Sequence, residues 1–454
     1  MMPDGLLVSF YGDDFSGSTD VVEAFATHGL PAVLFLKPPA ESDLRRFPGY
    51  RAVGVAGISR SQSPQWMQDN LPSVFESLSA LGSPFLHYKI CSTFDSSPTV
   101  GSIGAAAEIG LRVTGCPVAP VVVGAPVLRR YVLFGNLFAT VAGEGYRLDR
   151  HPTMSRHPIT PMAEADLRLH LARQTDLPVG LVDVLSLKGG SARDRYAEQA
   201  SRGARLILFD TLDSATLREA GDAIWNSRVA STTFVAGSSG FEYALLAYWE
   251  SLGWLPPKPA PPNPGSVDRL LVISGSCSPV TAQQIRHALA GGFVGVPIDP
   301  ERLTTDETEF QRALQAGESA LRQGGSPILH TAVGPDTVKS TEDAEFGRKI
   351  GQRLGALAAE LVRRCGVRRV VVAGGDTSGH AGLALEVDAL TMVCPFAPGS
   401  PLCRVWSANP GIDGVEILFK GGQVGDEGLF AAVRAGQGRK DVGPPDLENP
   451  QSKS

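Results

Sequence analysis

The chain has 454 residues, a length typical of two domains. Hydrophobic residues make up 43% and charged residues 19%, and the formal net charge of -6 argues against a nucleic-acid-binding protein, which usually carries a basic excess. No stretch approaches the roughly 20 apolar residues that a membrane span needs. The six cysteines include no C-x-x-C pair, and the start of the chain shows no signal-peptide pattern, so we expect a cytoplasmic protein with reduced thiols.

Short apolar runs alternate along the chain with longer stretches of helical periodicity. Residues 18–28 are predicted to form a helix, because Val21, Val22, Phe25 and Ala26 would share one face. The apolar runs that predict buried strands cover residues 5–11, 52–57, 121–124, 180–184, 206–209, 233–236, 270–274, 327–330 and 367–373. Strands that alternate with helices indicate parallel sheets covered on both faces.

A proline-rich segment, PPKPAPPNPG, occupies residues 256–265. Since proline donates no backbone hydrogen bond, this composition favours a stiff linker between domains over a long loop within one domain. We therefore expect an N-terminal domain at 1–255, a linker at 256–268, a C-terminal domain at 269–437 and a disordered tail at 438–454. Both domains are predicted to be Rossmann-like α/β domains with mainly parallel sheets, and the active site is expected in the cleft between them.

The first predicted strand leads into Gly-Asp-Asp-Phe-Ser-Gly-Ser at residues 12–18. Two adjacent carboxylates, Asp13 and Asp14, repel each other and need a cation, a proton or a donor-rich ligand. Ser16 adds a hydroxyl, and the amides of the following helix would face the same place. A simple helix cap is the alternative for one of the aspartates. The density of polar groups predicts a site for sugar hydroxyls or for a metal ion carried by a nucleotide.

A second polar loop, KICSTFDSS, covers residues 89–97. Lys89 follows an apolar stretch at residues 85–88, which places a cation at the end of a strand. Ser92, Thr93 and Asp95 add hydrogen-bonding groups to the same loop. This composition suits a polar, anionic substrate, although an ordinary Ser/Thr-rich turn would have the same composition.

Two arginines are candidates for binding an anion, because a guanidinium matches a carboxylate or a phosphate. Arg60 follows a predicted strand. Arg156 lies in the stretch RLDRHPTMSRHP at residues 147–158, for which a solvated basic loop is the alternative.

Two turns rich in glycine and hydroxyl groups follow strands in the C-terminal half, and such turns favour phosphate binding at the start of a helix. A third glycine turn follows the apolar run at 415–419, whereas no P-loop and no G-x-G-x-x-G fingerprint occurs. Asp376 or Thr377 could help to hold a magnesium ion. The candidate nucleotide-binding residues in these turns are Ser274, Ser276, Gly374, Gly375, Asp376, Thr377, Gly421 and Gly422.

These motifs, taken in order, resemble those of the four-carbon acid sugar kinase family. The family's D-D-x-T-G-[AS]-x-D, K-x-C-S-T-F-D-S, S-G-S-x-S, G-G-[ED]-T-S-G and K-x-G-x-x-G motifs are matched at residues 13–20, 89–96, 274–278, 374–379 and 420–425. Ser16 replaces the usual threonine and keeps its hydroxyl. His380 stands where a small residue is common, which could alter the local fit. The stretch at 147–158 is similar to a subgroup that handles 3-oxo acid sugars, including branched ones such as 3-oxo-isoapionate.

The resemblance implies an ATP- and Mg²⁺-dependent kinase that phosphorylates a terminal hydroxyl of a tetronate, 3-oxo-tetronate or branched 3-oxo acid. Asp13 or Asp14 would accept the hydroxyl proton, and Arg60, Lys89 or Arg156 would pair with the substrate carboxylate. We expect an acid sugar and ATP as partners, no nucleic acid or membrane, and a possible homodimer. The alternatives are a non-catalytic sugar-acid-binding protein and a sugar-acid aldolase or dehydrogenase, for which Lys89 would be the Schiff-base candidate.

Overall fold

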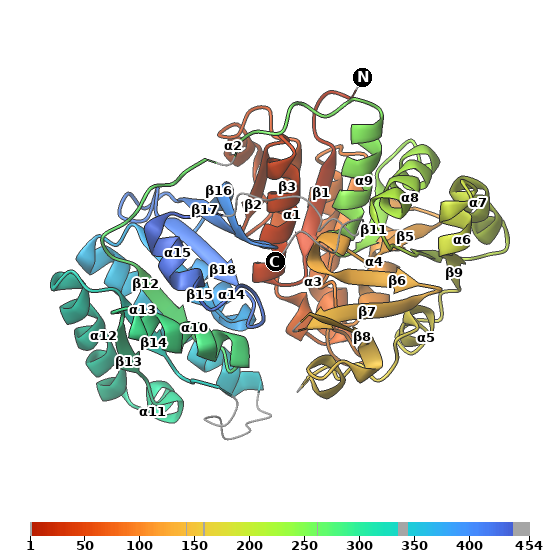
Figure 1. The fold of residues 1–454 in the computed structure, drawn as a ribbon. Helices are drawn as coiled ribbons and strands as arrows, with labels where there is room; N and C mark the ends of the chain where they lie inside the picture. The colour runs from red at the N-terminus through yellow and green to blue at the C-terminus, as the bar shows by residue number, and fades with distance from the viewer. Residues whose placement is uncertain (1, 142, 158, 261, 335–343, 439–454) are drawn as a thin grey trace, which may run out of the picture.

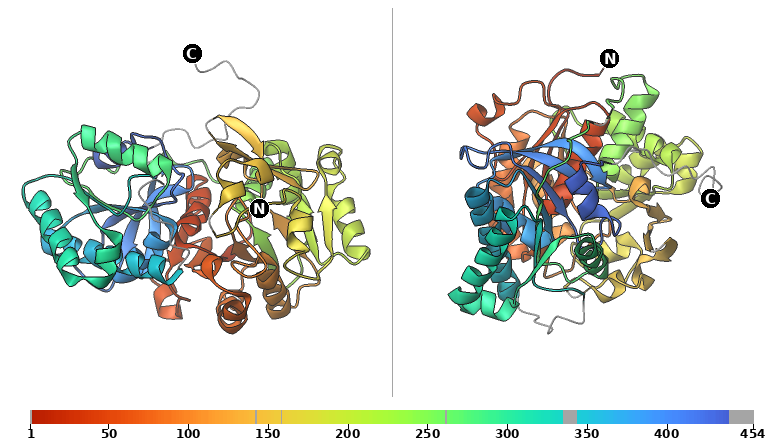
Figure 2. Two further views of the ribbon diagram at one scale, coloured as in Figure 1. Left: turned by 90° about the horizontal axis from the view of Figure 1, so that it is seen from below. Right: turned by 60° about the vertical axis from the view of Figure 1, so that its left-hand side comes forward.

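The computed structural model describes residues 2–141, 143–157, 159–260, 262–334 and 344–438. Its main feature is one sheet of 15 strands that runs through both halves of the chain, in the order β13-β14-β12-β15-β18-β17-β16-β2-β3-β1-β4-β11-β5-β10-β9. Figure 1 shows the two halves side by side, with helix α1 near their boundary. The left-hand view in Figure 2 shows the same arrangement from below.

The N-terminal half contributes eight parallel strands to this sheet. They are β1 (Val8–Gly12), β2 (Ala32–Phe35), β3 (Ala52–Ala56), β4 (Phe85–Lys89), β5 (Ala119–Val122), β9 (Val179–Val182), β10 (Leu206–Phe209) and β11 (Thr233–Gly237). The helices are α1 (Phe15–Thr27), α2 (Glu41–Leu44), α3 (Pro64–Ser79), α4 (Ile103–Thr114), α5 (Leu167–Leu171), α6 (Val184–Lys188), α7 (Ala192–Ser201), α8 (Ser214–Ser227) and α9 (Gly240–Ser251). A separate antiparallel sheet contains β6 (Arg130–Leu133), β7 (Asn136–Val141) and β8 (Glu144–Arg147).

The C-terminal half adds five parallel strands and then an antiparallel pair. The strands are β12 (Leu271–Ser274), β13 (Val294–Pro297), β14 (Pro327–His330), β15 (Arg369–Ala373), β16 (Ala389–Ala397), β17 (Ser400–Trp406) and β18 (Glu416–Lys420). The helices are α10 (Pro279–Ala290), α11 (Pro300–Thr305), α12 (Glu307–Arg322), α13 (Ala344–Cys365), α14 (Gly375–Ala384) and α15 (Leu429–Ala435). The predicted α/β class with mainly parallel strands is confirmed.

Apolar side chains from the N-terminal strands pack on both faces of the sheet, as expected for parallel strands covered by helices. Phe10 of β1 and Phe85 of β4 lie in a core that includes residues of α1 and α9. Tyr11 and Tyr88, from the same two strands, lie in a second core that includes residues of α3 and α4. This double burial holds the carboxyl ends of the strands in a fixed register.

The two halves contact each other through α1 and through the sheet itself. Strand β16 pairs antiparallel with β2, which joins the two sets of strands. The Phe15 ring packs edge-on against Phe419, with 4.8 Å between ring centroids. Gly382 of α14 makes room for this ring, since a Cβ there would lie 2.7 Å from Phe15 Cζ. The sequence did not predict that the two sheets would join.

The proline-rich segment forms no helix or strand in its described residues. Its end is held by Arg369, a buried side chain whose Nη1 donates to Gly265 O at 3.0 Å. We retain the predicted domain limits as a proposal. Residues 439–454 of the predicted tail lie outside the described residues. Within the described ranges, no helix has both the length and the apolarity needed to cross a lipid bilayer.

Candidate active site

The first group of site residues gathers because neighbouring strands of the N-terminal half end at one level. Gly12, the last residue of β1, pairs with Ala56 of β3 and with Lys89 of β4. The loops that follow are tied together, since Asp13 N donates to Lys89 O at 2.8 Å and Arg60 N donates to Asp13 O at 3.0 Å. Side chains from three separate loops therefore meet at the carboxyl edge of the sheet, where open α/β sheets bind ligands.

Asp13 and Arg60 form a bidentate ion pair. Arg60 Nε donates to Asp13 Oδ2 at 3.0 Å, and its Nη2 donates to Oδ1 at 2.6 Å. The same Nη2 lies 2.9 Å from Asp14 Oδ1. Burial raises the pKa of Asp13, and the charge of Arg60 opposes that effect. Burial alone would lower the pKa of Arg60, but the two carboxylates hold it well above its usual value. Arg60 is therefore a permanent cation that makes the carboxylate pair possible.

Asp14 is the N-cap of α1. Its backbone is extended (φ −138°, ψ 165°), Oδ1 accepts from Gly17 N at 2.8 Å, and Oδ2 accepts from Ser16 Oγ at 2.7 Å. The helix therefore begins at Phe15, and the prediction that it begins at Ser18 was wrong. The sequence was misleading because serine and glycine, which disfavour helix interiors, stand in the first turn, where the cap satisfies their amides.

Asp14 stays a carboxylate and faces the other half of the molecule. Burial would raise its pKa, but Arg60, the Ser16 hydroxyl, Lys89 and the Gly17 amide together lower it. A Cβ placed on Gly375, the first residue of α14, would lie 3.6 Å from Asp14 Oδ2. The Asp13-Asp14 loop and the second glycine turn, far apart in the sequence, thus lie next to each other.

The second predicted loop lies beside this group. Lys89 is buried and its Nζ is 3.7 Å from Asp20 Oδ2 on α1. The Thr93 hydroxyl lies 2.8 Å from the thiol of Cys91, and Ser92 is half-buried beside them. Burial raises the pKa of the Cys91 thiol to about 11, so the thiol is protonated at neutral pH. Asp95 Oδ1 is buried and has no hydrogen-bond partner among the described residues.

Arg156 is not brought into this group. It ends a short 3-10 helix (Met154–Arg156) and is exposed. In the described part of the chain, no hydrogen bond or ion pair links its side chain to the loops around Asp13 and Lys89.

Three turns of the C-terminal half also meet through strand register. Ser274 of β12 pairs with Ala373 of β15, which pairs with Lys420 of β18. The turns after these three neighbouring strands are 275–278, 374–377 and 421–422. All three predicted nucleotide-binding turns therefore lie side by side at one edge of the sheet.

Glycines allow these turns to approach closely. A Cβ on Gly275 would lie 2.3 Å from Thr377 Oγ1, and one on Gly422 would lie 2.8 Å from Ser276 Oγ. Gly374 has φ +123°, a conformation that side-chain-bearing residues rarely adopt. Such a concave surface of amides and hydroxyls suits a polyphosphate. The structure describes the backbone of Asp376 in α14, whereas its side chain lies outside the described part.

Lys420 is buried at the centre of these turns and was not selected from the sequence as a site residue. Its Nζ donates to Thr281 Oγ1 at 2.9 Å, and Thr281 Oγ1 donates to Gly422 O at 2.9 Å. Burial lowers the pKa of Lys420 to about 7. Within the described residues no carboxylate forms an ion pair with it. Its place in the glycine motif was the signal that could have identified it.

His380 does not disturb the glycine turn. It packs against α13, where Gly351 and Gly355 leave space: a Cβ on Gly351 would lie 2.4 Å from His380 Cδ2, and one on Gly355 would lie 2.7 Å from His380 O. The large side chain is thus accommodated by two small residues on the neighbouring helix.

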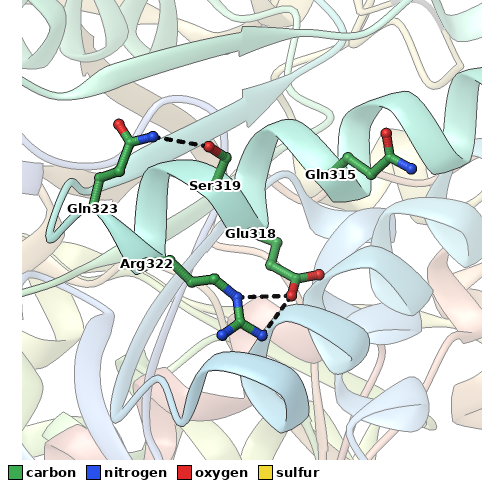
Figure 3. A pocket seen from close by; sticks show the side chains of 5 residues that line it. All are labelled: Gln315, Glu318, Ser319, Arg322 and Gln323. Atoms are coloured by element: carbon green, nitrogen blue, oxygen red, sulfur yellow. Dashed lines mark hydrogen bonds and ion pairs between the residues drawn. The ribbon is translucent and has the colours of Figure 1, made fainter.

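A shallow surface pocket on α12 lies away from both groups of site residues. It is lined by Gln315, Glu318, Ser319, Arg322 and Gln323. Figure 3 shows that these side chains project from α12 and from Gln323 directly after it, and that Arg322 is hydrogen-bonded to Glu318. It contains none of the predicted site residues.

Comparison with known proteins follows the same division of the chain. The family model for a sugar-binding N-terminal domain matches residues 8–245, and that for a nucleotide-binding C-terminal domain matches residues 271–430. A 3-oxo-isoapionate kinase from Paraburkholderia graminis is 49% identical over 449 residues, which cover 96% of this chain and 95% of that protein. The chain belongs to the four-carbon acid sugar kinase family.

More distant matches cover nearly the whole chain as well. A 3-oxo-tetronate kinase from Cupriavidus necator is 30% identical over 93% of this chain and 95% of that protein. A solved structure from Salmonella typhimurium LT2 matches with a TM-score of 0.77 at 24% identity, over 94% of this chain and 98% of that chain. The Haemophilus influenzae protein HI1011, of the DUF1537 family, matches with a TM-score of 0.68 at 24% identity, over 94% and 99%. These structures share the fold.

Proposed function

We propose that this chain is an ATP-dependent kinase that phosphorylates a terminal hydroxyl of a short 3-oxo acid sugar, either branched, as in 3-oxo-isoapionate, or linear, as in 3-oxo-tetronate. The observation that carries the proposal is the position of Asp14, next to Gly375 at the start of α14. A carboxylate from the sugar-binding half thereby faces the turns suited to a polyphosphate. The 49% identity to a 3-oxo-isoapionate kinase supports a branched acid.

In the proposed reaction, the substrate hydroxyl oxygen attacks the γ-phosphorus of ATP. The bond from the γ-phosphorus to the β-γ bridging oxygen breaks, ADP leaves, and Asp14 accepts the hydroxyl proton. Such transfer depends mainly on positioning and on neutralising charge. Mg²⁺ would enter with ATP and be held largely by phosphate oxygens and water, and Asp376 remains the candidate for a protein contact. Ser274, Ser276, Gly374, Gly375, Thr377, Gly421 and Gly422 would hold the nucleotide.

We propose different roles for the two aspartates on the basis of their contacts. Both oxygens of Asp13 accept from Arg60, so we assign it to holding that cation. Asp14 accepts from Ser16 and Gly17 and lies nearer to the nucleotide turns, so we assign it as the base. Ser16, Ser92, Thr93 and Asp95 are proposed to contact the sugar. Lys89 is paired with buried Asp20, which favours a charge-balancing role over that of a Schiff-base amine.

The test is ADP release with MgATP against a panel of tetronates, 3-oxo-tetronates and branched 3-oxo acids. We expect release that depends on the acid, and the best member of the panel names the substrate. Binding of ATP without release for any hydroxy acid would contradict the kinase proposal, and so would the absence of ATP binding. A homodimer and a cytoplasmic location stay predictions, and light scattering would check the first.

The lowered pKa of Lys420 predicts that the protein takes up a proton when it binds the nucleotide. With a pKa of about 7, its amine is mostly neutral at pH 8 in the free protein. The charge of bound MgATP would raise that pKa, so binding at pH 8 should take up about one proton. Calorimetry of MgATP binding in phosphate and in Tris, which have different ionisation enthalpies, measures the uptake. The same titration with Lys420→Met should show no uptake, and equal binding enthalpies for the wild-type chain in the two buffers would contradict the assignment.

A further inference from the structure

An acid sugar brings a carboxylate into the site. Of the three cations predicted to meet it, Arg60 and Lys89 are already neutralised within the protein, and Arg156 is exposed and lies outside their group. Arg60 uses its Nε and Nη2 for Asp13, and the same Nη2 contacts Asp14. Lys89 lies 3.7 Å from the carboxylate of Asp20. A cation that is already paired within the protein gains little from a further carboxylate, because it would have to share its donors. The substrate carboxylate therefore needs another partner.

Arg130 is a cation near this group that has a free donor edge. It is the first residue of β6, and its Nη1 donates to three backbone carbonyls: Leu128 O at 2.9 Å, Arg129 O at 3.3 Å and Thr140 O at 3.4 Å. Its Nε is buried and has no partner among the described residues, and no hydrogen bond or ion pair of its Nη2 occurs there either. This Nε–Nη2 edge is the one that Arg60 presents to Asp13.

Arg130 is a neighbour of the polar loop at 89–97: Val132 of β6 and Phe94 of that loop belong to the same buried cluster. Burial lowers the pKa of Arg130, while the carboxylate of the nearby Asp95 opposes that effect. Cys91, in this loop, is within electrostatic range of both Arg60 and Arg130. His151 is a further neighbour, whose pKa is lowered by burial and by the charge of Arg130. The charge of Arg130 is therefore felt by its neighbours and is not cancelled by a salt bridge.

Asp95 offers an unpaired hydrogen-bond acceptor where Arg130 offers an unpaired donor. It is close enough to Arg130 to influence it electrostatically, but the two form no ion pair within 4.0 Å. Asp95 Oδ1 and Arg130 Nε are both buried without a partner among the described residues. Leaving two such groups unsatisfied is unfavourable, and a ligand that offers an acceptor to one and a donor to the other would correct it.

We propose that Arg130 binds the substrate carboxylate through its Nε–Nη2 edge and that Asp95 accepts a hydrogen bond from a neighbouring hydroxyl. This assignment rests on the proposed kinase function and makes Arg130, in place of Arg60, Lys89 or Arg156, the residue that selects acids over neutral sugars. A carboxylate beside a hydroxyl is the shared feature of short acid sugars. The reacting hydroxyl, at the other end of the substrate, would then point toward Asp14.

The experiment compares an acid with its neutral analogue. For 3-oxo-tetronate the analogue is erythrulose, which has CH₂OH in place of the carboxylate; for another acid the matching CH₂OH compound is used. Arg130→Gln is expected to lower kcat/KM for the acid on the order of 10²-fold, because a buried charged partner is lost. The kcat/KM for the neutral analogue and the KM for ATP should stay within about threefold of the wild-type values, a change worth less than one hydrogen bond.

Two further variants make the result specific. Arg129→Gln removes the same charge from the adjacent, exposed residue and should leave kcat/KM for the acid unchanged. Arg130→Lys keeps a cation that can reach the backbone carbonyls but lacks the paired N–H edge, so it should fold like the wild-type chain in thermal melts and still lose acid preference.

Each alternative outcome is decisive. In one, the wild-type chain turns over the acid while Arg130→Gln either keeps its kcat/KM values or lowers them equally for the acid and the neutral analogue. That result overturns the Arg130 assignment but leaves the kinase proposal standing. Loss of acid preference in Arg156→Gln, with Arg130→Gln unaffected, gives the carboxylate to Arg156 and also overturns it. Absence of wild-type turnover with every acid overturns the kinase proposal, and this inference with it.

Discussion

Asp14→Asn is expected to lower kcat by roughly 10²–10⁴-fold, the usual contribution of a general base. Asparagine has the same shape and its Oδ1 can still accept from Gly17 N, so the helix cap should survive. The asparagine amide, however, cannot accept the proton of the substrate hydroxyl. Steady-state ADP release measures kcat, and calorimetry with MgATP checks that nucleotide binding is retained.

The control for this variant is another helix cap. Asp213 is the N-cap of α8, where its side chain accepts from Thr216 N, and it belongs to neither group of site residues. Asp213→Asn should leave kcat unchanged. Near-normal turnover by Asp14→Asn with intact ATP binding would remove the base assignment and leave Asp14 as a cap alone.

Arg60→Met is expected to destabilise the fold by roughly 3–5 kcal/mol at pH 8, the cost of leaving a buried charge without its partner. Asp13 loses both of its donors and Asp14 loses one contact. Burial already raises the pKa of Asp13 against the opposition of Arg60, so without Arg60 its pKa should rise further. A carboxyl with a raised pKa in the folded state stabilises the fold at low pH and loses that contribution as pH rises.

The loss of unfolding free energy caused by Arg60→Met should therefore be smaller at pH 5.5 than at pH 8. Urea unfolding of the variant and the wild-type chain at both pH values measures it. Arg193→Met is a matched control, because Arg193 pairs with Asp222 but is 53% exposed. Loss of such a surface pair should cost less than about 1 kcal/mol. The proposal that Arg60 balances the charge of the two aspartates would be contradicted if Arg60→Met lost as little unfolding free energy as the control. It would also be contradicted if that loss grew as the pH fell.

Much of the parallel sheet could be predicted because strands buried on both faces are continuous apolar runs. The strands at 206–209 and 327–330 have the predicted bounds. Most of the strands that were missed lack that signal, although β2, which is short but entirely apolar and buried, was missed as well. Three of the missed strands form the small antiparallel sheet, where β7 alternates half-buried with buried residues, and β16 and β17 contain Pro395 and Pro401.

The candidate site could be predicted from the sequence because polar residues that directly follow parallel strands lie together at the carboxyl edge of the sheet. This regularity selected Asp13, Lys89 and the glycine turns, and the observed register brings each group together. The sequence could not show which side chains neutralise each other, since that depends on distances such as the 2.6 Å between Arg60 and Asp13. Arg130 carried no motif, and its strand was not predicted.

The pairing of β16 with β2 has a consequence for shortened forms of the chain. Two residue pairs, Ala389 with Phe35 and Leu390 with Leu34, are what keep β2 from being an outer strand. Cut at the proline-rich segment, the N-terminal half would expose Ala32–Phe35, an entirely apolar strand with unpaired amides and carbonyls. Uncharged outer strands of this kind recruit other chains. Each half thus shields the aggregation-prone border of the other, and the separately expressed halves should self-associate more than the full chain does.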